Sequence, residues 1–406
     1  PRALVIACGN YALWALSAYT GASTSSEAQG RKVPTGIGNY RGSQLSTNAC
    51  DFTIPLLPIV HPAAIMRQWS QRAYAVHDLK ARVPIALRGD WSAPQTATLA
   101  PPGFDDAIGY LRELRGRVAV DVETRRGMLI CIALADSATS AIAIPWVRKS
   151  GKALSLYWTP EQEIALLHEL RRVLTSPACE IEGQNFLYDT QYIQAELGVS
   201  PVCAFDTMLA HHLLFPGTPK DLATLSSLYC AHHVFWKEET KEWDERGTLE
   251  QMLAYNCTDA MKTWECAAFL RTLVERMGMG ELWREEREKY VLALEMMNRG
   301  VRVDVAHRAK LAIDISSALA SESATLERIV PQALVAPSAK TPWWRSDKQT
   351  RHLLYTQLGC REQRNRKTGN ATVGKDALAR LAELHPEYTR VFDGLRRTGS
   401  LGVYHD

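Results

Sequence analysis

The sequence predicts an α/β protein, with a mixed sheet and helices over residues 104–278 and a mostly helical region over residues 279–406. Residues 117–123, 128–135 and 141–146 are short apolar runs of the strand type and predict a three-stranded meander. Further along the chain, longer segments carry apolar residues at helical spacing. Strands followed by such helices indicate a sheet covered by helices.

The composition is that of an ordinary globular protein. Its 406 residues are 46% hydrophobic and 22% charged, which is enough apolar material for about two to four domains. The formal net charge of +3 is only mildly basic. It permits a nucleic-acid partner but does not argue for one, because local patches matter more than the total.

Cysteine usage and the lack of targeting signals indicate a cytoplasmic protein. The nine cysteines follow no Cys-x-x-Cys pattern, as expected for reduced thiols. No apolar run reaches the roughly 18 residues of a membrane span, and the N-terminus lacks the layout of a signal peptide. The chain opens directly on an apparent strand without an initiator Met, so we expect a fragment of a longer protein.

The chain divides into an α/β segment (1–91), a linker rich in Pro, Ala and Thr (92–103), the sheet-containing domain (104–278) and the helical region (279–406). In the first segment we expect strands at 4–8 and 54–60, helices at 9–19 and 63–81, and a Gly/Ser/Thr-rich loop at 20–38. Later elements are a strand at 180–182 and helices starting at Thr159 and spanning 186–197, 248–277, 282–299, 305–329, 348–358, 374–383 and 387–399.

Asp121 and Glu123 lie on the first strand of the predicted meander. Side chains alternate faces along a strand, so these two carboxylates point the same way, about 6–7 Å apart. Like charges so close raise one another's pKa unless a cation lies between them. The pair therefore suggests a site for Mg²⁺ or Mn²⁺, although taken alone it is better explained as a solvated strand face.

Three later stretches add polar residues at informative positions. Asn185 is a good N-cap residue, and Asp189 follows one turn into the same helix, next to a strand end. Asp206 is interpreted as another N-cap. Tyr255 and Asp259 lie four residues apart and so share one face of the long helix.

The order Asp121-x-Glu123, Asp189, Tyr255-xxx-Asp259 resembles the 3′→5′ exonucleases of the DEDD superfamily, Tyr subtype. Residues 183–189, 205–210 and 221–225 look like the proofreading domain of family A, DNA polymerase I-like, enzymes. The resemblance covers residues 104–275. It implies a ribonuclease H-like fold, hydrolysis with two Mg²⁺ or Mn²⁺ ions, and a DNA substrate.

The resemblance also implies roles for the five residues. Asp121 would bridge both metals, Glu123 and Asp259 would hold the nucleophile-side metal, and Asp189 would hold the leaving-group-side metal. Tyr255 and Glu123 would orient the attacking water. A phenol with a pKa near 10 is a poor base at neutral pH, so Tyr255 is interpreted as a positioning group.

Other polar residues are open to two interpretations. Asn185 is expected to contact nucleic acid, and Arg125 and Arg126 either contact DNA phosphates or form an ordinary polar turn. The doublets 211–212 and 232–233 are pairs of histidines. Adjacent side chains point apart, so we expect structural or surface roles for them rather than metal binding.

The flanking regions carry weaker resemblances. Residues 296–304, 346–349, 354–359, 367–369, 385–386 and 397–404 resemble the start of a family A polymerase domain, with thumb helices that grip duplex DNA. The palm carboxylates and the nucleotide-binding fingers helix have no counterpart, so we expect no polymerisation.

Residues 7–12, 40–42, 58–65 and 77–79 look like the C-terminal half of a uracil-DNA glycosylase-like domain. His61 would lie on its His-Pro loop, and Cys8 is either a remnant iron–sulfur ligand or, more simply, a buried thiol. The water-activating half is absent, so no glycosylase activity is expected.

The sequence thus predicts a family A polymerase fragment, monomeric, whose complete site is a proofreading exonuclease for single-stranded or frayed 3′ ends in DNA replication and repair. Two alternatives stay open. One is a stand-alone ribonuclease D-like or RecQ-associated exonuclease, and the other is a non-catalytic DNA-binding scaffold.

Overall fold

A computed structural model describes residues 3–17, 36–47, 53–150, 153–237, 247–335, 341–365 and 369–405. Its contacts divide the chain into two units, residues 1–299 and 300–406. Most of the loop expected at 20–38, together with Lys367 and Thr368 of the polymerase-like motif, lies outside the described residues. Within the described ranges, no helix is both long and apolar enough to cross a membrane.

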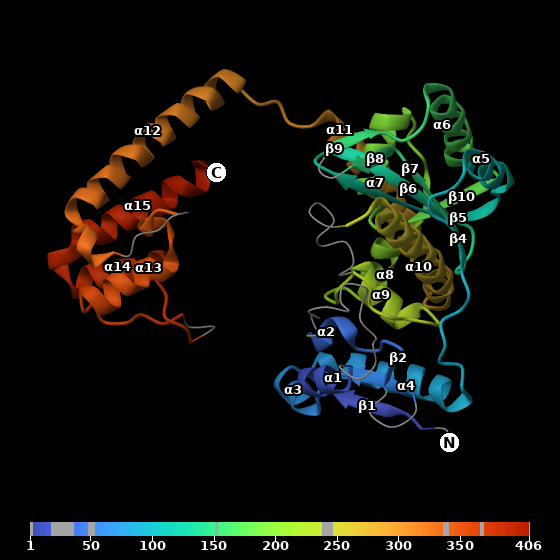
Figure 1. Ribbon diagram of the computed structural model, residues 1–406, viewed down its shortest axis with the longest axis horizontal. Helices are drawn as coiled ribbons and strands as arrows, with labels where there is room; N and C mark the ends of the chain where they lie inside the picture. The colour runs from blue at the N-terminus through green and yellow to red at the C-terminus, as the bar shows by residue number, and fades with distance from the viewer. Residues whose placement is uncertain are drawn as a thin grey trace. The chain divides into compact units, whose positions relative to one another are not determined.

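The first unit is built around a six-stranded mixed sheet in the order β11-β10-β5-β6-β7-β4 (Figure 1). Its antiparallel centre is the expected meander, and β10 and β11 add in parallel beside β5. The strands are β4 (Ala97–Leu99), β5 (Gly116–Arg125), β6 (Met128–Ala135), β7 (Ser140–Pro145), β10 (Cys179–Gly183) and β11 (Cys203–Asp206). A separate hairpin joins β8 (Val147–Ser150) and β9 (Ala153–Leu156).

Helices cover both faces of this sheet. They are α5 (Phe104–Glu113), α6 (Pro160–Thr175), α7 (Phe186–Leu197), α8 (Thr207–Leu214), α9 (Leu222–Tyr229), α10 (Leu249–Arg276) and α11 (Gly280–Arg299). Val118, Val120 and Val122 of β5 pack in the core that includes residues of α5, α6 and α7. Ala119 belongs to the opposite core, shared with α8, α9 and α10. The period of two in β5 therefore decides which side chains face α10.

The elements predicted between residues 104 and 299 are confirmed, apart from small shifts at their ends. Thr159 begins α6 as expected: its hydroxyl accepts from the Gln162 amide at 3.3 Å, with Pro160 at the first helical position. The stretch expected as a linker holds β4, which pairs in parallel with β7. β4 is only three residues long, too short for strand periodicity to reveal it in a Pro-rich stretch. The domain boundaries stay predictions.

The N-terminal segment forms its own small sheet, β1-β3-β2, from β1 (Val5–Cys8), β2 (Leu45–Thr47) and β3 (Ile54–Ile59). Its helices are α1 (Asn10–Ser17), α2 (Ile37–Tyr40), α3 (Pro62–Arg67) and α4 (Gln71–Arg88). The single helix expected at 63–81 is wrong, because the backbone turns extended at Gln68. α4 then continues to Gly89, whose left-handed φ of 89° ends it.

The second unit is helical, as predicted. It contains α12 (Val305–Ile329), α13 (Asp347–Arg351), α14 (Lys375–Leu384), α15 (Thr389–His405) and short turns of other helix types. α12 packs on α15 so closely that a Cβ at Gly394 would lie 2.6 Å from Leu326. Leu326, Leu381 and Phe392 are fully buried in this unit's core.

Candidate active site

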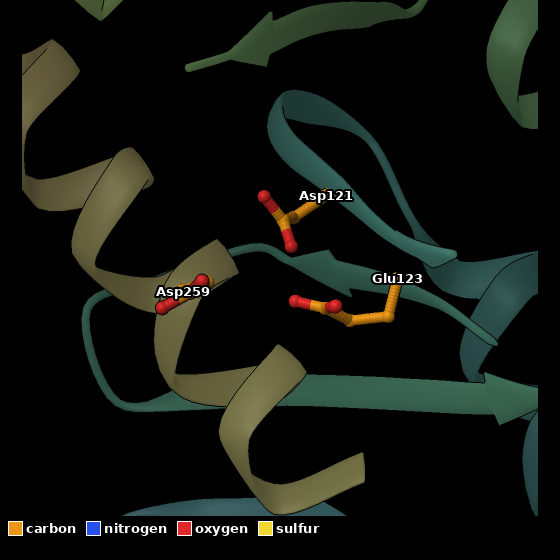
Figure 2. A group of neighbouring side chains, drawn as sticks. All are labelled: Asp121, Glu123 and Asp259. Atoms are coloured by element: carbon orange, nitrogen blue, oxygen red, sulfur yellow. The ribbon is translucent and has the colours of Figure 1, made fainter. Parts of the chain in front are cut away.

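Three carboxylates meet between β5 and α10. Asp121 and Glu123 lie on β5, and Asp259 lies on α10. One oxygen of each carboxylate lies within 4.8 Å of the others, and Figure 2 shows the three groups pointing toward one another. The expectation that Asp121 and Glu123 share a strand face is confirmed. Closely spaced hard oxygen ligands are the donor set that Mg²⁺ and Mn²⁺ prefer, so these residues fit a divalent metal.

Asn256 fixes the orientation of Asp121. Its Nδ2 donates to Asp121 Oδ2 at 2.6 Å and to the Asp121 carbonyl at 3.3 Å. Asn256 is fully buried on α10, one turn before Asp259. Sequence reasoning missed Asn256. Its position three residues before Asp259 puts both on one helix face, and this spacing could have indicated that Asn256 also faces the site.

Asp189 lies close to the three carboxylates but outside their group. It is 5% exposed at the start of α7, and its Oδ1 accepts from the backbone amide of Val122 at 2.8 Å. This bond ties α7 to β5 between the two acidic positions. The structure thus brings Asp121, Glu123 and Asp259 together and holds Asp189 beside them through the strand backbone.

The Asp206 carboxylate accepts from amides at the start of two helices, whereas the Asn185 side chain makes no cap hydrogen bond. The Asp206 carboxylate accepts from Met208 and Leu209 at the start of α8, at 2.9 and 3.1 Å, which confirms its predicted role. It also accepts from Asn185 and Phe186 at the start of α7, at 3.3 and 2.8 Å.

Asn185 stands at the N-cap position of α7, as predicted. It adopts a left-handed conformation with φ of 56°, and its side chain makes no cap hydrogen bond. The buried Asp206 carboxylate already accepts from the amides at the start of α7. A role for Asn185 in nucleic-acid binding stays a prediction.

Tyr255 lies one turn before Asp259, as its spacing predicts, and both side chains contact Lys237. Lys237 Nζ donates to Tyr255 Oη at 2.9 Å and forms an ion pair with Asp259 Oδ2. Trp236 Nε1 donates to Asp259 Oδ1 at 2.6 Å. Sequence reasoning missed Trp236 and Lys237, because no local spacing relates a loop to a helix that follows it.

The pKa values of the site carboxyls are raised because several negative charges lie close together in a buried environment. Burial raises the pKa of Asp121 well above its usual range, and Asp259, Asp189 and Glu123 raise it further. Burial, then Asp259, raises the pKa of Glu123 to about 7, and burial raises that of Asp189 to about 8. Such shifts are typical of sites that bind a cation.

The nearby cation keeps its charge. Burial disfavours the ammonium of Lys237, but Asp259, Tyr255 and Asp121 outweigh it, so the pKa of Lys237 is raised. Burial also raises the pKa of Tyr255, with Asp259 adding to the effect. The phenol is therefore held neutral, in agreement with a positioning role.

The remaining candidates lie at the rim or in the core. Arg125 Nη1 lies 3.6 Å from Glu123 Oε2, and Arg126 takes a left-handed turn conformation with φ of 54°. Whether they contact phosphates stays a prediction. His211 bonds to Tyr229 and Thr218, and His233 bonds to Ser226, so their predicted structural roles are confirmed.

Residues 103–275 match the model of a 3′–5′ exonuclease family of the DNA polymerase A type. This match includes the strand β5 and the helices α7 and α10, which carry Asp121, Glu123, Asp189 and Asp259. Together with the mixed sheet covered by helices, it confirms the predicted fold class, a ribonuclease H-like exonuclease fold. Residues 103–275 are therefore similar to a 3′–5′ exonuclease domain. No curated protein matches the chain.

Among solved structures, the chain is similar to the POL domain of Pol1 from M. smegmatis in complex with DNA primer-template and dNTP. That similarity has 19% identity and a TM-score of 0.46, and it covers 76% of this chain and 48% of that one. Brucella melitensis NrnC is similar at 16% identity and a TM-score of 0.38, over 51% of this chain and 93% of that one. The same protein with bound Mg²⁺ is similar at 17% identity and a TM-score of 0.38, over 52% of this chain and 96% of that one. The chain thus spans about half of the mycobacterial chain.

Proposed function

We propose that this chain is a metal-dependent 3′→5′ exonuclease that removes nucleotides one at a time from DNA 3′ ends, as the proofreading part of a family A DNA polymerase. The observation that carries the proposal is the convergence of Asp121, Glu123 and Asp259 from β5 and α10. This convergence lies inside the stretch that matches the exonuclease family.

Asp121, Glu123 and Asp259 would hold divalent metal, with Asp189 beside them, and Asp121 would serve both ions. Two bound Mg²⁺ or Mn²⁺ ions supply an activated water and stabilise charge on the attacking and leaving oxygens of a phosphodiester. The carboxylates must be deprotonated to do this, and their raised pKa values mean that protons compete with the metal.

The rest of the chemistry belongs to positioning. Tyr255 lies beside Asp259, and its neutral hydroxyl can orient the attacking water without taking its proton. Glu123 shares that task from the strand. Asn256 holds the Asp121 carboxylate in one orientation, so the site is ordered before substrate arrives.

The sequence after Gly300 supports a polymerase fragment over a stand-alone nuclease. It resembles the start of a polymerase domain, and its predicted helices form. The presence of all four acidic residues with Tyr255 supports an enzyme over a DNA-binding scaffold. A cytoplasmic location and a monomeric state stay predictions.

Digestion of a 5′-labelled single strand of DNA tests the function. With Mg²⁺ we expect a ladder that shortens from the 3′ end, and with EDTA no shortening. Asp121→Asn, which keeps the side-chain shape, is the control for a contaminating nuclease. Cleavage inside the strand, removal from the 5′ end, or equal rates with EDTA would each refute the proposal.

A further inference from the structure

We propose that the N-terminal segment is a positioning part of the exonuclease site. In this proposal, Gln44 and Arg82 fix the loop at residues 230–237 so that Lys237 and Trp236 hold Asp259 and Tyr255. The inference rests on the proposed function, because Asp259 and Tyr255 are the residues that it orients.

The end of this loop contacts the site directly. Trp236 Nε1 and Lys237 Nζ donate to the two different oxygens of the Asp259 carboxylate. Each carboxylate oxygen has two lone-pair directions, so a donor on each still leaves one free for a metal. Lys237 also donates to Tyr255 Oη, and its ammonium lies 4.8 Å from the centre of the Tyr255 ring. One short loop thus fixes both a metal ligand and a water-positioning hydroxyl.

The same loop contacts the residues that directly precede β2. The backbone N–H of Gln44 donates to the His233 carbonyl at 2.7 Å. The backbone N–H of His233 donates back to the side-chain oxygen Oε1 of Gln44 at 3.1 Å. The Phe235 amide donates to Ser43 Oγ at 3.2 Å, and the Phe235 ring packs on Tyr40 at 5.0 Å. These contacts lie directly before Trp236 and Lys237, so they set where those two side chains begin.

Arg82 of α4 anchors the start of the loop. Its guanidinium donates to the carbonyls of Ser227, Cys230 and Ala231, at 3.0, 3.1 and 2.7 Å, and is 2% exposed. A buried guanidinium is costly unless its donors are satisfied, and here main-chain oxygens at the end of α9 satisfy several of them. α10 also holds this first part, through Lys262 and Glu265. The part next to Lys237 is held by the N-terminal segment.

The contacts between the N-terminal segment and the loop matter because a small displacement of a reacting group lowers the reaction rate strongly. Misplacement by about 1 Å can lower the rate on the order of 100-fold. Gln44 touches neither Asp259 nor Tyr255 in any described contact, so it can act on the chemistry only through the loop. The N-terminal segment therefore contributes to hydrolysis without a catalytic residue of its own.

The test measures kcat and KM separately on single-stranded DNA for variants of the whole chain. Lys237→Met should lower kcat roughly 100-fold with little change in KM, and Lys237→Arg, which keeps the cation, should restore part of it. Gln44→Met should lower kcat about 10-fold. When Lys237 is already replaced by Met, adding Gln44→Met should lower kcat by less than about 2-fold more, because Gln44 acts on the site through Lys237.

Thr47→Val is the matched control. Thr47 is buried in the same segment, and its hydroxyl donates to the Leu16 carbonyl at 3.1 Å, inside that segment. Thr47→Val should lower the stability of the fold about as much as Gln44→Met does, but it should leave kcat unchanged. Hydrogen exchange of the peptide covering 231–237 should accelerate in Gln44→Met and not in Thr47→Val.

Three results would overturn the inference: unchanged kcat in Lys237→Met, additive effects of Gln44→Met and Lys237→Met, or equal effects of Gln44→Met and Thr47→Val. An inactive unmodified chain would instead refute the proposed function. In that case the hydrogen-exchange comparison still reports whether the segment holds the loop.

Discussion

Asp121 is the residue on which the proposed site depends most, because Asp259, Asp189 and Glu123 all act on its carboxylate. If Asp121 serves both ions, as proposed, Asp121→Asn should lower kcat by about 10³-fold or more. The fold should survive, because an amide oxygen can still accept from Asn256. In EDTA at pH 8 the melting temperature should hold or rise, as one of several repelling charges is gone. Rates near those of the unmodified chain would remove Asp121 from the site.

The raised carboxylate pKa values give stability a definite pH dependence. Glu123 has a pKa of about 7 and Asp189 of about 8 in the folded chain, against ordinary values of 4.5 and 3.8. Burial lowers the pKa of His77, His211, His232 and His233, so above about pH 7 these histidines are mostly neutral in both states. Between about pH 7 and pH 8.5 the two carboxyls then make the folded state bind more protons than the unfolded state, so the free energy of unfolding falls as pH rises. Urea unfolding in EDTA at pH 7, 7.8 and 8.5 should show this fall. Saturating Mg²⁺ should reduce it, and a rise of stability over this range would contradict the assignment.

Tyr255 and Asp259 share a helix face but do different work. In the proposed function, Tyr255→Phe would remove a hydroxyl that positions water, whereas Asp259→Ala would remove a metal ligand. Asp259→Ala also leaves Lys237 without its carboxylate partner. The first should cost about 10- to 100-fold in kcat, and the second about 10³-fold or more. Single-turnover rates separate the two. Equal losses would indicate that Tyr255 transfers a proton.

At the scale of the elements, one carboxylate joins two helix starts. Asp206 accepts from amides of both α7 and α8, and α7 carries Asp189. Asp206→Ala should lower the free energy of unfolding by about 2 kcal/mol or more, because two N-caps are lost at once. Urea unfolding at pH 7 checks this value. Asp221→Ala, which removes the cap of α9 alone, is the control and should cost roughly half as much.

The elements that sequence reasoning found are those with a strong local signal. The alternation at 117–123 and the apolar spacing of 186–197 and 305–329 gave strands and helices with nearly the observed bounds. The roles of Lys237 and Arg82 could not be found this way. Their partners lie far along the chain, so only the fold reveals the contacts. At Asn185 the local signal overstates the role of the side chain. Asparagine is a favoured N-cap residue, but here the buried carboxylate of Asp206 accepts from the amides at the start of α7.

At the scale of the whole molecule, the proposed proofreading function predicts which 3′ ends the chain prefers. The site is formed where a strand, a helix start and a long helix meet, so a single strand should enter it more easily than a stacked duplex end. Unpairing a terminal base costs a few kcal/mol, least at a mismatch, so mispaired primer ends should be shortened faster than matched ones. Binding to duplex should weaken with salt, because phosphate contacts release counterions. Two 5′-labelled primers that differ only in the terminal base, each annealed to the same template, measure the preference at two salt concentrations. The single strand of each primer is the control and should be cut at one rate. Equal rates on the two duplexes would contradict a proofreading role while leaving the exonuclease itself intact.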